Sequence, residues 1–190
     1  MVNQIIVCDL EATCWPSEGD FPIEQMETIE IGCVLADFDG HILDEFTTFV
    51  RPIESPELSD FCTELTTITQ GDVDGAPAIG EAMDLLDQWV AGRDVIWGSW
   101  GNFDRKLLLS QQQRYGLEQD FYQLAHINLK RAWRRTTKKR RKNALSDALT
   151  FHGLTFEGTQ HRAISDARNT ARLLQFIPQG EIDLQFQPDS

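Results

Sequence analysis

The sequence lacks a long hydrophobic run and a cysteine framework. No apolar stretch approaches the roughly 20 residues that a membrane-spanning helix needs. The N-terminus has no basic region followed by a long apolar segment and a small-residue cleavage site, so we expect a cytoplasmic protein. Its four cysteines include no C-x-x-C pair. This spacing favours buried, reduced thiols over disulfides or a zinc site.

Basic residues are scarce except in one place. The formal net charge is −13, from 17 basic and 30 acidic residues. Nine of the basic residues lie between Lys130 and Lys142, which we call the basic segment, and no acidic residue lies among them. The rest of the chain has eight basic residues against thirty acidic ones, a balance of −22. The average therefore conceals an acidic body with one concentrated basic segment.

A length of 190 residues and a hydrophobic content of 41% favour one globular domain with a substantial core. We expect the domain to span residues 1–180, with residues 181–190 as a loosely attached C-terminal tail. The sequence has no G-x-x-x-x-G-K-[ST] loop, which argues against phosphotransfer of the P-loop type.

Hydrophobic periodicity predicts strands and helices in a mixed order. Strands are expected at residues 5–11, 27–37, 41–50 and 94–98, with an Asp39-Gly40 hairpin turn between the second and third. Residues 66–70 read as a turn or short helix, and residues 71–77 as a loop. Helices are expected at residues 55–61, 78–90, 103–115, 127–133, 144–151 and 163–176. A hairpin beside a parallel strand that is reached by a helical crossover makes a mixed sheet flanked by helices, an α/β or α+β fold.

The stretch from Ile5 to Trp15 places two carboxylates at the end of the first expected strand. Residues two apart point to the same face of a strand, so Asp9 and Glu11 should lie side by side. Their like charges repel unless a positive group lies between them, and carboxylates are ligands that Mg²⁺ and Mn²⁺ prefer. The alternative is a solvated strand end without a function.

Two further acids follow the same pattern. Asp104 comes after a short strand at the start of a helix, and Asp166 lies in the first turn of the last expected helix. His161 lies five residues before Asp166. Each acid taken alone also fits a first-turn residue that the helix dipole favours, and a loop histidine is often a bystander. Taken jointly, four carboxylates at strand or helix ends and one histidine favour a metal-dependent site.

This order resembles the 3′→5′ exonucleases of the DEDD superfamily. Asp9-Leu10-Glu11 matches their first motif, Asn102-Phe103-Asp104 the second, and the H-x4-D spacing of His161 and Asp166 the third, in the histidine (DEDDh) subgroup. The segments DLEATCW, EIG, FCTELT and INLK resemble the Eri-type exoribonuclease branch. The resemblance implies a single domain with an RNase H-like fold, a mixed five-stranded sheet flanked by helices.

The resemblance also implies an activity: hydrolysis of phosphodiester bonds from the 3′ end of RNA, with release of nucleoside 5′-monophosphates. Two Mg²⁺ or Mn²⁺ ions would be held by Asp9, Glu11, Asp104 and Asp166, and His161 would act as the general base. Two alternatives are a 3′→5′ exodeoxyribonuclease acting on single-stranded or mismatched DNA ends, and a non-catalytic binding module. The second alternative predicts the loss of at least one acidic ligand, and all are present.

Candidate substrate contacts complete the predicted site. Ala12 and Thr13 are expected near the terminal sugar, and apolar side chains are expected to stack on the last bases, although Phe61 and Leu65 also fit core positions. The basic segment is either a platform for the nucleic-acid backbone around Trp133 or a solvated loop, and in a eukaryote it would also suit nuclear localisation. The expected contacts are Ala12, Thr13, Phe61, Leu65, Asn102, Phe103, Arg134, Arg135, Lys138 and Lys139.

Overall fold

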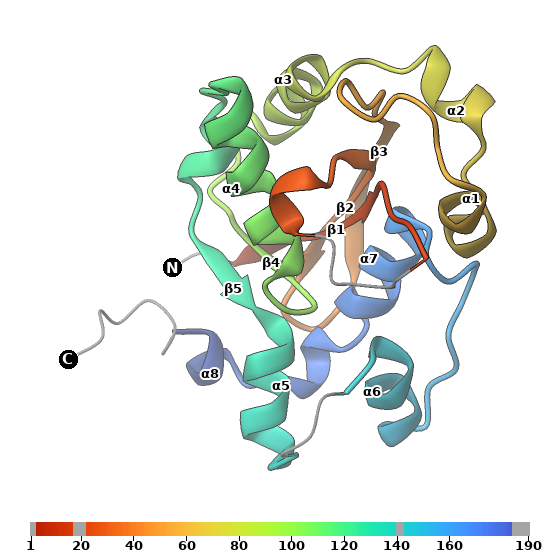
Figure 1. The fold of residues 1–190 in the computed structure, drawn as a ribbon. Helices are drawn as coiled ribbons and strands as arrows, with labels where there is room; N and C mark the ends of the chain where they lie inside the picture. The colour runs from red at the N-terminus through yellow and green to blue at the C-terminus, as the bar shows by residue number, and fades with distance from the viewer. Residues whose placement is uncertain (1–2, 17–21, 140–142, 184–190) are drawn as a thin grey trace.

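The fold is a mixed five-stranded sheet with the strand order β3-β2-β1-β4-β5, as the resemblance implied (Figure 1). The computed structural model of the protein describes residues 3–16, 22–139 and 143–183. Strands β1 and β2, and β2 and β3, pair antiparallel, whereas β4 runs parallel to β1 and β5 parallel to β4. The strands are β1 (Gln4–Ala12), β2 (Thr28–Asp37), β3 (Ile42–Phe49), β4 (Ile96–Ser99) and β5 (His126–Asn128).

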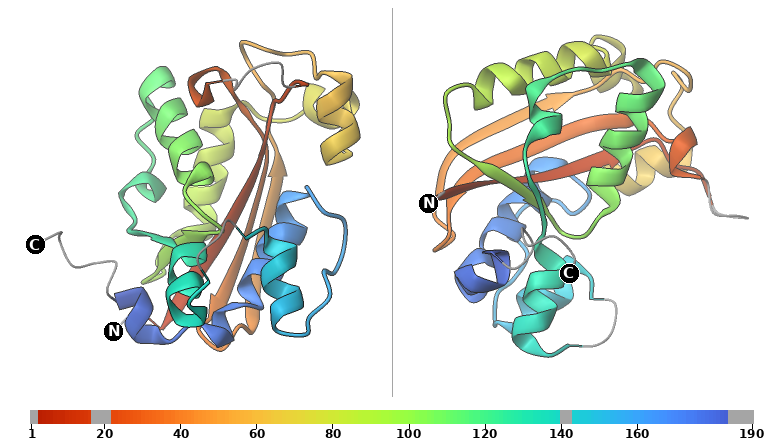
Figure 2. Two further views of the ribbon diagram at one scale, coloured as in Figure 1. Left: turned by 60° about the horizontal axis from the view of Figure 1, so that its bottom comes forward. Right: turned by 90° about the vertical axis from the view of Figure 1, so that its left-hand side faces the viewer.

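Helices cover both faces of the sheet, which Figure 2 shows edge-on in its left view. One face packs on α3 (Ile79–Val90) and α4 (Phe103–Tyr115), and the other on α5 (Leu129–Thr137), α6 (Leu145–Phe151), α7 (Ala163–Ala171) and α8 (Gln179–Asp183). The short helices α1 (Asp60–Thr66) and α2 (Gln70–Asp74) lie beside one end of the sheet. Three 3-10 turns cover Ile23–Gln25, Asp120–Gln123 and Leu174–Phe176.

Strand β1 is buried on both faces, and its side chains alternate between the two cores. Ile5 and Val7 pack with α5, α6 and α7, whereas Ile6, Cys8 and Leu10 pack with α3 and α4. Because alternate residues of a strand share a face, Asp9 and Glu11 continue the row of Ile5 and Val7. They therefore point toward the side of the sheet that α7 covers.

Glycine at position 32 lets α7 approach the sheet closely. Gly32 lies opposite Asp9 in the β1–β2 register. A Cβ atom at this position would lie 2.2 Å from the backbone nitrogen of Ile164 and 2.3 Å from the carbonyl carbon of Ala163. Only glycine leaves room for this contact of backbone on backbone. The first turn of α7 is thereby placed directly over the carboxylates of β1.

Two predicted elements of the first half of the chain differ in the structure. The helix expected from Ser55 begins at Asp60, where Ser59 caps it by accepting a hydrogen bond of 3.0 Å from the Cys62 N–H. The N–H groups of residues 53–55 donate instead to the buried Glu27 carboxylate, so they are not available for a helix. Residues 71–77 were expected to be a loop, but residues 71–74 belong to α2.

The second half also departs from the prediction. Residues 127–133 were expected to be helical throughout, but Ile127 belongs to the short strand β5, and α5 starts only after Asn128 caps it. The expected helix 163–176 ends at Ala171, and a separate 3-10 turn covers Leu174–Phe176. Ordered structure also passes the expected boundary at residue 180, because α8 includes residues 181–183 and Ile182 is fully buried. Residues 184–190 lie outside the described part of the chain.

Candidate active site

Three carboxylates meet at the carboxyl end of the central strand. Asp9 and Glu11 lie on β1, and Asp166 lies in the first turn of α7. One oxygen of each carboxylate lies within 4.8 Å of the other two. Glu11 is 9% exposed, and Asp9 and Asp166 are half-buried. The side-by-side arrangement expected for Asp9 and Glu11 is observed, and the last long helix adds a third acid.

Asp104 approaches from the opposite face, in the first turn of α4. It is 6% exposed, and its Oδ1 accepts a hydrogen bond of 3.1 Å from the Leu10 N–H. This bond joins α4 to the middle of the acidic stretch of β1. Asp104 is not one of the three acids that lie within 4.8 Å of one another, but its charge raises the pKa of Asp9.

His161 directly precedes the N-cap of α7. It is exposed and has a left-handed backbone conformation, with φ at 59°. Such a φ is uncommon for a residue other than glycine and turns the chain sharply before the helix begins. Burial raises the pKa of the Asp166 carboxyl group, whereas the charge of His161 and the backbone N–H groups of His161 and Arg162 act to lower it. The predicted histidine and acid therefore lie near each other at the start of α7.

Burial raises the pKa of all four carboxyl groups, and neighbouring carboxylates add to this effect. The pKa of Glu11 is raised to about 8, first by burial and then by neighbouring carboxylates, of which Asp166 acts most strongly. Burial raises the pKa of Asp104 to about 6. Burial also raises the pKa of Asp9, with Asp104 as the next cause, and that of Asp166 despite the opposing effect of His161. The arrangement is electrostatically unfavourable on its own.

The donor set fits a divalent metal ion. Asp9, Glu11 and Asp166 converge with Asp104 beside them, and Oδ2 of Asp166 is buried without a hydrogen-bond partner. A buried carboxylate oxygen without a partner is costly, and a hard cation would satisfy it and offset the repulsion among the acids. The residues present therefore match the chemistry of a Mg²⁺ or Mn²⁺ site.

The family follows from a comparison of the sequence with known proteins. The sequence profile of the RNase_T family, described as exonucleases, matches residues 6–174, a span that contains Asp9, Glu11, Asp104, His161 and Asp166. The chain belongs to this family of exonucleases. It is a DEDDh 3′→5′ exonuclease, a phosphodiester hydrolase with an RNase H-like fold. Exonucleases of this family use divalent metal ions, in agreement with the donor set.

Among curated relatives, this exonuclease is 30% identical over 192 residues to the 3′-5′ exonuclease Snipper of Drosophila melanogaster, covering 90% of this chain and 68% of that protein. It is 33% identical over 187 residues to the human ERI1 exoribonuclease 3, covering 92% of this chain and 53% of that protein. The chain therefore spans about half the length of the latter relative.

Solved structures agree with this assignment. The nuclease domain of 3′hExo, a DEDDh family member bound to rAMP, matches with a TM-score of 0.83 and 30% identity over 92% of this chain and 90% of that chain. The 3′-exonuclease in a structure of histone mRNA stem-loop recognition matches with a TM-score of 0.80 and 30% identity, covering 92% of this chain and 80% of that chain.

Of the expected substrate contacts, the large apolar side chains are exposed. Phe61 and Leu65 are each 38% exposed and lie one turn apart on α1, so the alternative that they are core residues is wrong. Phe103, at the start of α4, is 45% exposed. The exonuclease therefore presents large apolar side chains to solvent on α1 and at the start of α4, the two places where the sequence predicted base contacts.

The other contacts expected near these residues, Ala12, Thr13 and Asn102, have hydrogen-bond partners within the fold. Thr13 is 2% exposed, and its Oγ1 accepts a hydrogen bond of 3.0 Å from the Glu27 N–H. Ala12 is buried, and its carbonyl oxygen accepts from the Cys62 thiol. Asn102 is exposed and accepts a hydrogen bond from Asn128. The side chain of Thr13 thus fixes the turn after β1.

The basic segment is partly a helix, and its tryptophan is a core residue. Trp133 is fully buried on α5, and its Nε1 donates a hydrogen bond of 2.9 Å to Nε2 of His152. The expectation that Trp133 contributes to a nucleic-acid platform is therefore wrong: apolar residues at helical spacing turn it inward. Residues 140–142 lie outside the described part of the chain.

The cations of α5 and the residues after it face outward. Four of them line one surface pocket, namely Arg131, Arg134, Arg135 and Lys139. Arg135 pairs with Glu181 at 3.1 Å, and the ammonium of Lys139 lies 4.5 Å from the centroid of the Phe151 ring. Lys138 is exposed at the left-handed C-cap of the helix.

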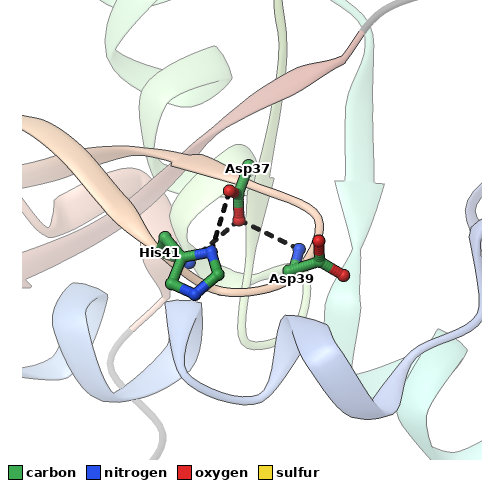
Figure 3. Close-up of side chains that lie close together, drawn as sticks. All are labelled: Asp37, Asp39 and His41. Atoms are coloured by element: carbon green, nitrogen blue, oxygen red, sulfur yellow. Dashed lines mark hydrogen bonds and ion pairs between the residues drawn. The ribbon is translucent and has the colours of Figure 1, made fainter.

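A second acidic cluster has a structural explanation. Asp37, Asp39 and His41 lie at the hairpin between β2 and β3 (Figure 3). Oδ1 of Asp37 accepts hydrogen bonds from the N–H groups of Asp39 and His41, and its Oδ2 lies 3.0 Å from Nδ1 of His41. These bonds are those of a side chain that closes a turn.

Among the described residues, no helix is long and apolar enough to cross a membrane.

Proposed function

We propose that this exonuclease is a metal-dependent exoribonuclease that removes nucleoside 5′-monophosphates from the 3′ ends of RNA. Support for RNA comes from the relatives: the human relative at 33% identity is named an exoribonuclease, and the structure with a TM-score of 0.83 carries rAMP. The alternative substrate, single-stranded or mismatched DNA, has no relative of comparable identity among these proteins to support it.

The observation that carries the proposal is the meeting of Asp9, Glu11 and Asp166 within 4.8 Å, with one oxygen of Asp166 buried and unpartnered. Together with Asp104, these acids would hold two ions, Mg²⁺ or Mn²⁺. When bound, such a pair supplies Lewis-acid stabilisation of the attacking and leaving oxygens in an in-line displacement. The acids come from β1 and from helices on the two faces of the sheet, α4 and α7.

The protein's own residues handle the proton. We assign His161 as the general base, because an imidazole nitrogen accepts a proton near neutral pH and the side chain is exposed next to the acids. The attacking water gives a proton to this nitrogen as its oxygen bonds to phosphorus, and the bond between phosphorus and the 3′ oxygen of the preceding nucleotide breaks. The departing 3′ oxygen takes a proton from bulk water, and the released product is a nucleoside 5′-monophosphate. The position of His161 in an exposed loop lets the proton pass on to bulk water.

The remaining residues orient the RNA. Phe61, Leu65 and Phe103 offer apolar surface on which the last bases stack, a contact that tolerates any base. The backbone around Ala12 and Thr13, together with Asn102, would contact the terminal nucleotide. The cations of the basic segment would attract the upstream phosphates, with Arg134, Arg135, Lys138 and Lys139 as the contributors.

A degradation assay on matched oligonucleotides tests the proposal. RNA and DNA of one sequence, labelled at the 5′ end, are incubated with Mg²⁺, with Mn²⁺ or with EDTA. The expected result is a ladder that shortens from the 3′ end on RNA, faster than on DNA, and only with metal. Asp166→Asn is the inactive comparison, and His41→Ala at the distant hairpin turn is the folded, active control. Internal cuts, or activity in EDTA, would overturn the mechanism; a faster rate on DNA would overturn the substrate.

A further inference from the structure

Glu30 is a buried acid that the proposed reaction does not use. It lies on β2 directly opposite Glu11 of β1 and is 2% exposed. Its carboxylate accepts three hydrogen bonds, all from the start of α7. Arg162 donates two, from Nη2 at 2.9 Å and from Nε at 3.2 Å, and the Ala163 N–H donates the third at 2.9 Å.

These bonds cap the start of α7, which the N-cap residue of the helix does not do. Arg162 occupies the N-cap position but makes no side-chain capping bond to the helix. The first N–H groups of a helix need acceptors, and a carboxylate there also interacts favourably with the helix dipole. Glu30, 133 residues earlier in the chain than Ala163, supplies that acceptor.

The pair also fixes the helix in space. Both guanidinium nitrogens that face Glu30 are engaged, and the Arg162 guanidinium lies 5.3 Å from the centroid of the Phe49 ring on β3. Gly32, two residues after Glu30, allows backbone contact with Ala163 and Ile164. The start of α7 is thus held by charge-assisted bonds at one point and by close packing at another.

The residues on either side of Arg162 are those of the proposed site. His161 precedes it, and Asp166 follows within the first helical turn. Any shift of Arg162 relative to β2 therefore moves the imidazole and the third carboxylate relative to Asp9 and Glu11. Arg162 has a second effect: it neutralises Glu30, which would otherwise be an unpaired buried charge facing Glu11.

We infer that Glu30 and Arg162 form a positioning pair that holds His161 and Asp166 against the acids of β1. This role rests on the proposed function of those residues. Neither member of the pair transfers a proton or takes part in bond breaking. The Arg162 side chain is 29% exposed, so direct binding of a substrate phosphate is the competing role. Glu30, at 2% exposed, has no access to substrate, which makes the two roles separable.

The test compares Glu30→Gln, Arg162→Ala and Arg162→Lys with Arg168→Ala. Arg168 lies on the same helix and pairs with Glu45 of β3, so its removal deletes an ion pair between α7 and the sheet away from the acids. For each variant of the 190-residue chain, kcat and KM are measured on a short RNA and Mn²⁺ affinity is measured by calorimetry without RNA. Folding is checked by circular dichroism and Tm. Residues that orient metal ligands typically change affinity or activity by about 10–100-fold.

The expected result is a fall in kcat of about 10–100-fold in both Glu30→Gln and Arg162→Ala, with weaker Mn²⁺ binding and KM within about threefold of wild type. Arg162→Lys should recover part of the loss, and Arg168→Ala should match wild type. The inference is overturned if Arg162→Ala raises KM alone, if Glu30→Gln keeps wild-type kcat and Mn²⁺ affinity, or if Arg168→Ala shows the same loss. A wild-type protein that binds Mn²⁺ but leaves RNA intact would instead contradict the proposed function, while weaker Mn²⁺ binding in Glu30→Gln and Arg162→Ala would still support the pair.

Discussion

The Leu10 N–H donates a hydrogen bond of 3.1 Å to Oδ1 of Asp104, across 94 residues of sequence. Leu10 lies between Asp9 and Glu11, so this bond places the first turn of α4 at the middle of the acidic stretch of β1. The fourth acid of the proposed site is thus fixed by backbone geometry.

Replacement of His161 should remove turnover without removing the metal site. His161→Ala deletes the proposed base and leaves the four acids in place, so kcat should fall by at least about 100-fold while Mn²⁺ affinity stays near wild type. Single-turnover assays and calorimetry measure the two quantities. His41→Ala, an exposed histidine in the β2–β3 hairpin turn, is the matched control. Wild-type turnover in His161→Ala would contradict the assignment.

The metal-free protein should be more stable at pH 6 than at pH 8. The folded-state pKa of Glu11 is raised to about 8, above the usual value of a glutamate. Between these pH values the folded state binds a proton at Glu11 that the unfolded state does not, so stability falls as pH rises toward 8 and levels off above it. The expected difference is roughly 2 kcal/mol, from about 1.4 kcal/mol per pKa unit.

Urea unfolding in EDTA at pH 6, 7 and 8 measures this slope. Glu11→Gln has no proton to release at this position and should lose most of the pH dependence. Saturating Mn²⁺ should flatten or reverse the slope, because ligands bind the ion only when deprotonated. A metal-free protein whose stability rises with pH over this range would contradict the electrostatic account of the site.

Replacement of an exposed aromatic residue should weaken RNA binding, whereas replacement of a buried one should lower folding stability. Phe61 is 38% exposed on α1, so Phe61→Ala should raise KM for RNA with little change in Tm. The rise in KM reflects the loss of about 1–3 kcal/mol of stacking free energy with a base. Trp133 is fully buried, and Trp133→Ala should cost about 3–5 kcal/mol of folding stability. Kinetics on short RNA and chemical denaturation measure the two effects. A large loss of stability in Phe61→Ala would show that this side chain contributes to the hydrophobic core.

The cations of the basic segment should determine the salt dependence of RNA binding. Neutral replacement of Arg134, Arg135, Lys138 and Lys139 in an Asp166→Asn background should weaken binding and reduce the slope of log K against log salt by about 0.7 per lost phosphate contact on single strands. Fluorescence anisotropy at several salt concentrations measures the slope. Arg93→Gln together with Arg168→Gln removes two cations elsewhere as a control. An unchanged slope would show that the basic segment does not contact the RNA.

Local sequence was sufficient for much of the fold. Apolar runs and turn residues predicted β1 to β4, the Asp39-Gly40 turn, α3, α4 and α6, because these elements have a clear period or clear terminal signals. The strand β5 was missed, since three residues carry no period, and it forms only because β4 pairs with it. The start of α1 was misplaced because buried Glu27 captures the N–H groups upstream of it.

The residues of the candidate site also differ in whether the sequence alone could predict them. The spacing of Asp9 with Glu11, and of His161 with Asp166, was readable because each pair is local, and the resemblance joined them to Asp104. Glu30 and Arg162 were missed as partners because they are 132 residues apart and each is unremarkable alone. A motif containing Glu30 was visible in the EIG segment, but nothing local showed what its carboxylate binds.

The sequence by itself determined which residue types bear the chemistry and which local element holds each of them. The tertiary structure decided which side chains face the site, since burial is set by what packs against each face. Phe61 and Trp133 are both aromatic residues on short helices, yet Phe61 is exposed on α1 whereas Trp133 is buried on the inner face of α5. The repulsion among the four acids likewise arises only when α4 and α7 bring Asp104 and Asp166 to the end of β1, and this convergence is what creates the need for a cation.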